Sequence, residues 1–246
     1  MNSSILKKAL RLTLPVFFGY IAIGLAFGIM MTSAGYPWYL SLFMSIFDLT
    51  GTGQFFAVAL LSGGSGLGEI LLVEFLLSIR HIFYALSLLT KYKGTGKVKP
   101  YLIHTITDET FALIQSLEDV SDSEKIPLYT AISALDQFYW CLGTLAGALG
   151  CEILVKLNLS SYLEGVDFAL TALLIVILID QIKNSKQYIP CIAGCIVAVV
   201  AVCLYKAGIM QSSNIIWTSI TTALGVIFLL KGPSFFKSNK DNKEVL

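Results

Sequence analysis

Residues 12–34 read LTLPVFFGYIAIGLAFGIMMTSA, an apolar run of 23 residues that carries no charge. A transmembrane helix needs about 20 such residues to cross the hydrocarbon core of a bilayer. Lys7, Lys8 and Arg11 precede the run. The run is too long for the apolar core of a secretory signal, so we expect it to remain in the protein as a first membrane helix.

Apolar segments of similar length fill most of the remaining chain. Of the 246 residues, 56% are hydrophobic and 13% are charged, whereas about 25% are charged in soluble domains. Strands of a membrane barrel are about 10 residues long and alternate apolar and polar residues, and these segments do not show that pattern. The sequence therefore predicts an all-α, polytopic membrane helix bundle that forms a single domain over residues 1–246, with a disordered tail at 237–246. The later apolar segments are 38–61, 67–90, 101–118, 128–151, 166–182, 187–206 and 212–230.

Two of these segments are poorly suited to crossing a bilayer as regular helices. Segment 38–61 contains DLTGTGQ at 48–54, and segment 101–118 contains HTITDET at 104–110. Irregular backbone survives at membrane depth only where protein or a watery cavity satisfies it. If both segments enter and leave on one side, the Lys and Arg residues outside the segments divide 14 to 2 between the two sides, as the positive-inside rule favours. We therefore expect about six full spans plus two broken or re-entrant segments; the alternative is two polar but complete helices.

A short internal similarity suggests a repeat. The sequence GQFF at 53–56 resembles DQFY at 136–139. This similarity favours a 3+3 inverted repeat of residues 12–90 and 101–182, an arrangement common in transporters.

Arg80 lies in the middle of an apolar segment, within EFLLSIRHIFY at 74–84. Arginine stays charged at any accessible pH, and its planar fork fits a carboxylate. Charged groups inside the membrane usually mark substrate or ion pathways. One interpretation is that Arg80 holds a substrate carboxylate, or a carboxylate that alternates with substrate. The other is a permanent structural ion pair with one of three acids, namely Asp48, Glu74 or Asp108.

Other polar residues in apolar segments are candidates for carrying protons. They are Asp108, Glu109, Asp136 and His81. Burial raises the pKa of a carboxyl group towards neutrality, which suits reversible protonation, and histidine titrates near physiological pH. Thr107 and Asp108 are also good residues for capping the start of a helix. The alternative for His81 is a structural hydrogen bond to a neighbouring helix.

The sequence lacks the motifs of several functional classes. The sequence GTGK at 94–97 does not have the spacing of a phosphate-binding loop, and GGSGL at 63–67 lacks the final glycine of a nucleophile elbow. The two histidines show no zinc-binding spacing. The net charge of +1 gives no sign of nucleic-acid binding. We therefore predict no enzymatic activity, no metal and no cofactor.

Four stretches together resemble the AzlC/YgaZ family, the large subunits of two-component branched-chain amino acid exporters. They cover roughly the first 150 residues, and the sequence departs from the family pattern at Asp48 and Ser78. The stretches are PVFFGYIAIGLAFG (15–28), GTGQF (51–55), RHIFY (80–84), and TDETF (107–111) followed by Trp140, Thr144, Gly147 and Gly150.

The resemblance implies export of leucine, isoleucine, valine or analogues across the cytoplasmic membrane, driven by an ion gradient, with a small AzlD-type membrane partner. Under this hypothesis, the charged ends of the amino acid bind Arg80 and the unwound residues Gly51, Thr52, Gly53 and Gln54. The apolar end rests against aromatic side chains, namely Phe55, Phe56, Tyr84 and Phe111. The alternative is a non-transporting membrane subunit that assembles or regulates a partner.

Overall fold

The computed structural model describes residues 3–117, 120–159 and 188–209, together with isolated positions at 168, 172, 175, 179, 182, 183, 222 and 225. These residues form helices and turns, and none of them lies in a strand. The all-α prediction is confirmed for this part of the chain. The chain divides into two compact units, Met1–Thr171 and Ala172–Leu246, which we describe separately.

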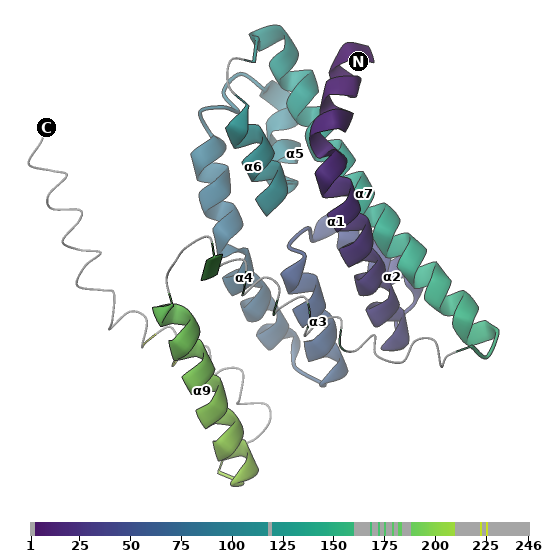
Figure 1. Ribbon diagram of the computed structural model, residues 1–246, viewed down its shortest axis with the longest axis vertical. Coiled ribbons are helices and arrows are strands. Elements are labelled where there is room, and N and C mark those ends of the chain that lie inside the picture. Colours follow the sequence, from purple (N-terminus) through teal and green to yellow (C-terminus); the bar gives the residue numbers. More distant parts are fainter. Residues whose placement is uncertain are drawn as a thin grey trace, which may run out of the picture. The chain divides into compact units, whose positions relative to one another are not determined.

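Three long helices frame the first unit: α1 (Ser3–Ser33), α4 (Leu67–Leu88) and α7 (Asp122–Lys156) (Figure 1). By length and composition, each is able to cross a membrane. Large apolar side chains such as Leu71 and Phe83 stand exposed on α4. A helix that is apolar on its outer faces as well as its inner face is typical of a membrane span.

Helices α1 and α7 lie side by side and run in the same direction (Figure 1). Near their starts Ala9 packs in one cluster with Leu128, and near their ends Ser33 Oγ lies 3.5 Å from Cys151 Sγ. Between these points a Cβ atom at Gly28 would collide with the backbone of Thr144 and Ala148. The small residues of the two GxxxG patterns, 24–28 and 143–147, therefore allow the close backbone contact that such patterns favour.

The two segments predicted to be irregular are both interrupted. Segment 38–61 forms α2 (Trp38–Phe47) and α3 (Thr52–Ser62), separated by residues 48–51. Segment 101–118 forms α5 (Lys99–His104), which follows a 3₁₀ turn, η1 (Gly96–Val98), and α6 (Asp108–Ser116), with residues 105–107 between them. The breaks thus fall within the DLTGTGQ and HTITDET stretches. The prediction that Gly51–Gln54 are all unwound is wrong for Thr52, Gly53 and Gln54, because α3 already begins at Thr52.

Each pair of short helices returns to the end of the bundle from which it starts (Figure 1). The ring of Tyr92, just after α4, lies 6.0 Å from the ring of Tyr129 near the start of α7. Helix α4 therefore ends where α7 begins and runs opposite to α7 and α1. It follows that α2 and α3 begin and end at one end of the bundle, and that α5 and α6 begin and end at the other.

The count of six full spans and the inverted repeat of 12–90 and 101–182 are not confirmed. Among the described residues three helices are long and apolar enough to span. In the second unit, helix α9 (Ile189–Lys206) matches the predicted segment 187–206. Apart from isolated positions, the predicted segments 166–182 and 212–230 and the tail 237–246 lie outside the described residues.

Candidate functional site

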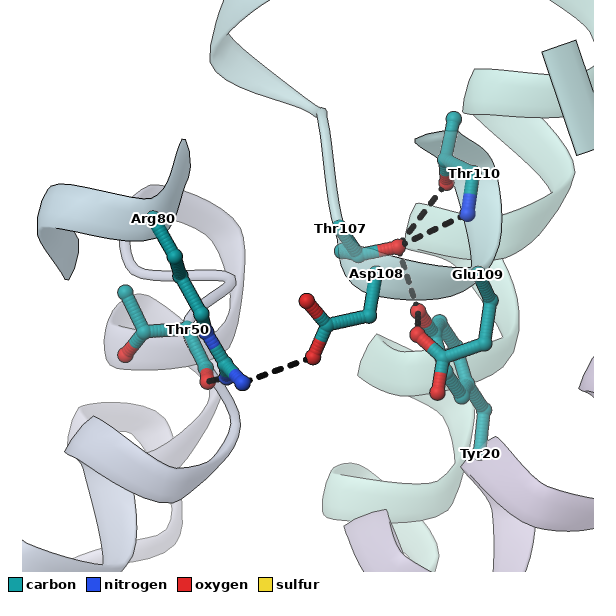
Figure 2. A network of polar contacts seen from close by, with 7 residues as sticks. All are labelled: Tyr20, Thr50, Arg80, Thr107, Asp108, Glu109 and Thr110. Carbon is teal, nitrogen blue, oxygen red and sulfur yellow. Dashed lines mark hydrogen bonds and ion pairs between the residues drawn. The ribbon is translucent and has the colours of Figure 1, made fainter. Parts of the chain in front are cut away.

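Arg80 joins the two broken segments (Figure 2). Its Nη1 atom lies 2.8 Å from Oδ2 of Asp108, the first residue of α6. Its Nη2 atom donates to the backbone carbonyl of Thr50, 3.4 Å away, in the break between α2 and α3. Of the three acids proposed as its partner, the structure selects Asp108. Both side chains are partly exposed, by 31% for Arg80 and 41% for Asp108.

The break between α2 and α3 is shaped by its own side chains. Asp48 Oδ1 accepts hydrogen bonds from the backbone nitrogen of Thr50 at 3.1 Å and from its hydroxyl at 2.7 Å. Such local bonds hold the backbone in a turn instead of a helix. Gly51 follows at φ 60°, in the left-handed region that glycine adopts without strain. The turn leaves the Thr50 carbonyl free of helical bonding, so it is available to Arg80.

A second carboxylate approaches the same turn from α4. Glu74 Oε2 lies 3.4 Å from the Thr50 hydroxyl, which therefore stands between the carboxylates of Asp48 and Glu74. A Cβ atom at Gly53 would collide with the Glu74 carboxylate and the Thr50 hydroxyl. The absence of a side chain at Gly53 thus lets Glu74 reach the turn.

The free carbonyl groups at the end of α2 are satisfied by neighbouring helices. The Ile46 carbonyl accepts from Gln137 Nε2 at 3.1 Å and lies 3.4 Å from His104 Nε2. The Ser45 carbonyl accepts from Cys141 Sγ at 3.6 Å. The last carbonyls of a helix have no partner within it, and at membrane depth other protein groups must satisfy them. Side chains of α5 and α7 supply these partners for the carbonyls of α2.

Gln54 belongs to a buried scaffold. It is fully buried, and its Oε1 accepts from the indole nitrogen of Trp140 at 2.8 Å. Its Nε2 donates to Ser45 Oγ at 3.4 Å, and that hydroxyl pairs with Thr144 Oγ1 at 2.8 Å. The structure therefore joins the Gln54 side chain to α2 and α7. Phe55 is likewise buried, edge-on to Phe27.

The break between α5 and α6 carries a second polar cluster. The Thr107 hydroxyl accepts from the Thr110 backbone nitrogen at 3.2 Å, so Thr107 caps α6, as its residue type predicted. The Tyr20 hydroxyl of α1 lies 2.6 Å from Thr107 Oγ1 and 2.7 Å from Glu109 Oε2 (Figure 2). The Thr110 hydroxyl donates to the buried Asp136 at 2.7 Å.

The far end of α6 is held by Lys91, just after α4. Its ammonium group donates to the carbonyls of Ile114, Gln115 and Leu117, each at 2.8 Å. A cation is favourable at the carbonyl end of a helix. Arg80 near the start of α6 and Lys91 at its end therefore tie this helix to α4 at two points.

Aromatic rings lie next to Arg80 on the same face of α4. Tyr84, one turn further along, stacks on Phe111 of α6 with ring centres 4.4 Å apart. His81 meets the Tyr84 ring edge-on at 5.9 Å. This apolar surface borders the Arg80–Asp108 pair.

The structure thus gathers most of the predicted residues into two adjoining groups. Arg80, Asp108, Tyr84 and the turn 48–51 form one group, and Glu109 and Asp136 belong to the other. Sequence reasoning did not single out Tyr20 or Thr50. Thr50 lies within the polar stretch 48–54, which is a usable signal, whereas Tyr20 stands in an apolar run that gives none.

Comparison with known proteins identifies the family. A family model described as AzlC protein matches residues 15–154. The branched-chain amino acid transport protein AzlC of Bacillus subtilis is 31% identical over 227 residues, which are 92% of this chain and 85% of that protein. An uncharacterized membrane protein of Helicobacter pylori is 35% identical over 199 residues, 81% of this chain and 85% of that protein.

More distant matches agree. The inner membrane protein YgaZ of Escherichia coli is 26% identical over 230 residues, 91% of each chain. No solved structure matches the chain. The family resemblance read from the four motifs is confirmed: the chain is a multi-pass membrane protein and belongs to the AzlC family.

Proposed function

We propose that this chain exports branched-chain amino acids across the cytoplasmic membrane, driven by an ion gradient and in complex with a small AzlD-type membrane protein. The name of the Bacillus subtilis relative supports the substrate class. The observation that carries the proposal is the position of Arg80, whose side chain bonds to both broken segments at once. Substrate sites of transporters are commonly built from such interrupted helices.

The substrate carboxylate is proposed to replace Asp108 on the guanidinium. Arginine binds a carboxylate best through two parallel hydrogen bonds. In the structure Asp108 takes Nη1, while Nε is buried without a hydrogen-bond partner among the described residues. A donor is therefore free to help bind an incoming carboxylate.

The amino group of the substrate is proposed to meet the acceptors around the first break. The acceptors there are the Thr50 carbonyl and the carboxylates of Asp48 and Glu74, together with Asp108 once it is released. Gly51 ends this turn, and Thr52 and Gly53 are the first residues of α3, where Gly53 leaves room for Glu74. Gln54 has its side chain bonded within the scaffold, so in this proposal it supports the turn and does not bind substrate.

The apolar side chain of the substrate is proposed to rest against Tyr84 and Phe111. The two stacked rings stand beside the ion pair. An aliphatic side chain packed on aromatic rings is stabilised by burial, at about 25 cal/mol for each square ångström removed from water.

In the membrane, α2–α3 and α5–α6 are proposed to be re-entrant. The start of α1, residues 91–99 and Lys125 then lie at the end of the bundle where α5 and α6 enter. This end carries most of the Lys and Arg residues of the first unit, so by the positive-inside rule it faces the cytoplasm. The two breaks then meet near the bilayer midplane, and Arg80 links them.

The direct test measures leucine efflux from proteoliposomes that contain the chain and its small partner. Arg80→Ala is expected to lower efflux about tenfold or more, because it removes a charge-assisted contact worth roughly 1.5–3 kcal/mol. Asp108→Asn should lower efflux too, because it removes the charge of an acceptor for the substrate amino group. Arg11→Ala is the matched control, since Arg11 is exposed near the start of α1. Undiminished efflux from both variants would remove this mechanism. No efflux from the wild-type protein would favour the non-transporting subunit.

A further inference from the structure

We propose that three hydroxyl groups, those of Tyr20, Thr107 and Thr110, form a relay that passes a proton between Glu109 and Asp136. The inference rests on the proposed function, because it supplies the path by which an ion gradient would drive transport. Chains of polar groups inside the membrane are how pumps and transporters commonly carry protons.

The five side chains form one continuous row of hydrogen bonds. The row starts at Glu109, crosses to α1 at Tyr20, returns to Thr107 and Thr110 of the second break and α6, and ends at Asp136 in α7. The first part is visible in Figure 2. Between oxygen atoms the steps measure 2.7 Å, 2.6 Å, 3.0 Å and 2.7 Å.

The hydrogens of the row are able to point in one direction along its whole length. Tyr20 donates to Thr107, Thr107 donates to Thr110, and Thr110 donates to Asp136. A proton on Glu109 then moves to the Tyr20 oxygen while the hydroxyl proton of Tyr20 moves on to Thr107. Each hydroxyl gives one proton and receives one. The net change is the loss of a proton by Glu109 and its gain by Asp136, and no hydroxyl is left ionised.

The row ends at Asp136, whose carboxyl group is buried inside the helix bundle. Asp136 is 1% exposed, and its Oδ1 atom has no hydrogen-bond partner among the described residues. An ionised carboxylate buried without full pairing is costly, and inside a membrane such residues are rare and usually functional. Among the described residues, Glu109 of α6 and Tyr20 of α1 are the titratable groups that interact electrostatically with Asp136. A site that gains and loses a proton accounts for this acid.

The relay and the Arg80 site are joined through α6. Asp108 and Glu109 are neighbours, so on a helix they point about 100° apart. Asp108 points to Arg80 and Glu109 to Tyr20 (Figure 2). Thr107 caps the same helix and is itself a member of the row. Release of Asp108 from Arg80 by substrate would therefore shift the helix start on which the relay depends, which couples the two steps.

The test uses the full-length chain with its partner in proteoliposomes and compares two assays. One is leucine accumulation driven by a pH gradient, and the other is leucine counterflow at equal pH, which moves no net proton. Thr110→Val removes the hydroxyl and keeps the shape of the side chain. We expect gradient-driven accumulation to fall about tenfold or more, with counterflow at the wild-type level and with Thr110→Ser restoring accumulation.

Two further variants test a second member of the relay and a hydroxyl outside it. Tyr20→Phe removes the first hydroxyl and keeps the ring that packs edge-on against Trp140, and it should lose accumulation in the same way. Thr130→Val is the matched control, because the Thr130 hydroxyl bonds to the Ile126 carbonyl within α7, and it should leave both assays unchanged.

The outcomes separate the relay from the proposed function. Wild-type accumulation in both Thr110→Val and Tyr20→Phe would overturn the relay. Wild-type counterflow with no response to a pH gradient would also overturn it, and would leave amino acid transport standing. No counterflow by the wild-type protein would overturn the proposed function and the relay together.

Discussion

Gly53 shows how one missing side chain shapes the site. The Glu74 carboxylate and the Thr50 hydroxyl fill the space that a Cβ atom would take. Glu74 thereby reaches the turn, where it stands with Asp48 around one hydroxyl. A single methyl group at this position would displace an acidic side chain from the region proposed to bind the substrate amino group.

Gly53→Ala is therefore expected to lower both stability and transport. Overpacking of this kind costs about 1–3 kcal/mol, which should appear as a lower midpoint of thermal unfolding in detergent. Adding Glu74→Ala to Gly53→Ala should recover part of the midpoint, because it removes the Glu74 carboxylate and leaves the Thr50 hydroxyl in collision. A double variant no more stable than Gly53→Ala alone would contradict this account of the glycine.

For Arg80, the kind of partner was predictable from the sequence, but its identity was not. The presence of an acidic partner for Arg80 was predictable, because an unpaired charge is costly in a membrane. The identity of this acid was not predictable, because three acids lie in neighbouring apolar segments and each could pair with Arg80. They are Asp48, Glu74 and Asp108. The choice of Asp108 depends on the rotation of α6 about its own axis. Gln54 looked like a ligand for the same reason: its polarity was visible, but its burial against Trp140 was not.

At the scale of elements, the two interrupted segments are the main feature of the fold. Their interruptions follow from local chemistry: Asp48 bonds back to Thr50, Gly51 takes a positive φ, and Thr107 caps the next helix. The free carbonyls that result are met by side chains of α5 and α7. The breaks are therefore stable only together with the helices around them.

The re-entrant course of α2–α3 can be tested by labelling. In a background without the native cysteines, Ala34→Cys and Ser62→Cys place exposed thiols just after α1 and at the end of α3. Both should react with a membrane-impermeant maleimide added outside intact cells, because both ends of the pair lie on one side. Lys93→Cys, at the opposite end, should react only after permeabilisation. Labelling of Ala34→Cys and Ser62→Cys from opposite sides would show that α2–α3 crosses the membrane.

At the scale of the molecule, the contact between α1 and α7 holds the site together. Helix α1 supplies Tyr20 and helix α7 supplies Asp136, the residues that meet α6 from either side. Their backbones approach closely where Gly28 faces Thr144 and Gly147 faces Leu25. A shift of these two helices would separate the acids that the relay connects.

Gly28→Ala is expected to destabilise the protein by about 1–3 kcal/mol through overpacking at this contact. Gly19→Ala, in the same helix, is the matched control, since no atom lies within 4 Å of a Cβ placed there. That substitution should raise stability slightly, by about 0.5–1 kcal/mol, because alanine is the better helix former. The thermal midpoints of the two variants in detergent should therefore move in opposite directions, and equal midpoints would contradict the close contact.

Taken alone, the sequence determined the helical membrane class, the positions of both broken segments and the presence of charged groups within the apolar core. These follow from hydropathy, glycine and capping residues, which act over a few neighbouring residues. Only the tertiary structure decided that Arg80 pairs with Asp108, that Gln54 is buried, and that Tyr20 connects Glu109 to Thr107. The reason is physical: these contacts join residues far apart in the chain, and they depend on the direction, crossing and rotation of whole helices, which no local pattern encodes.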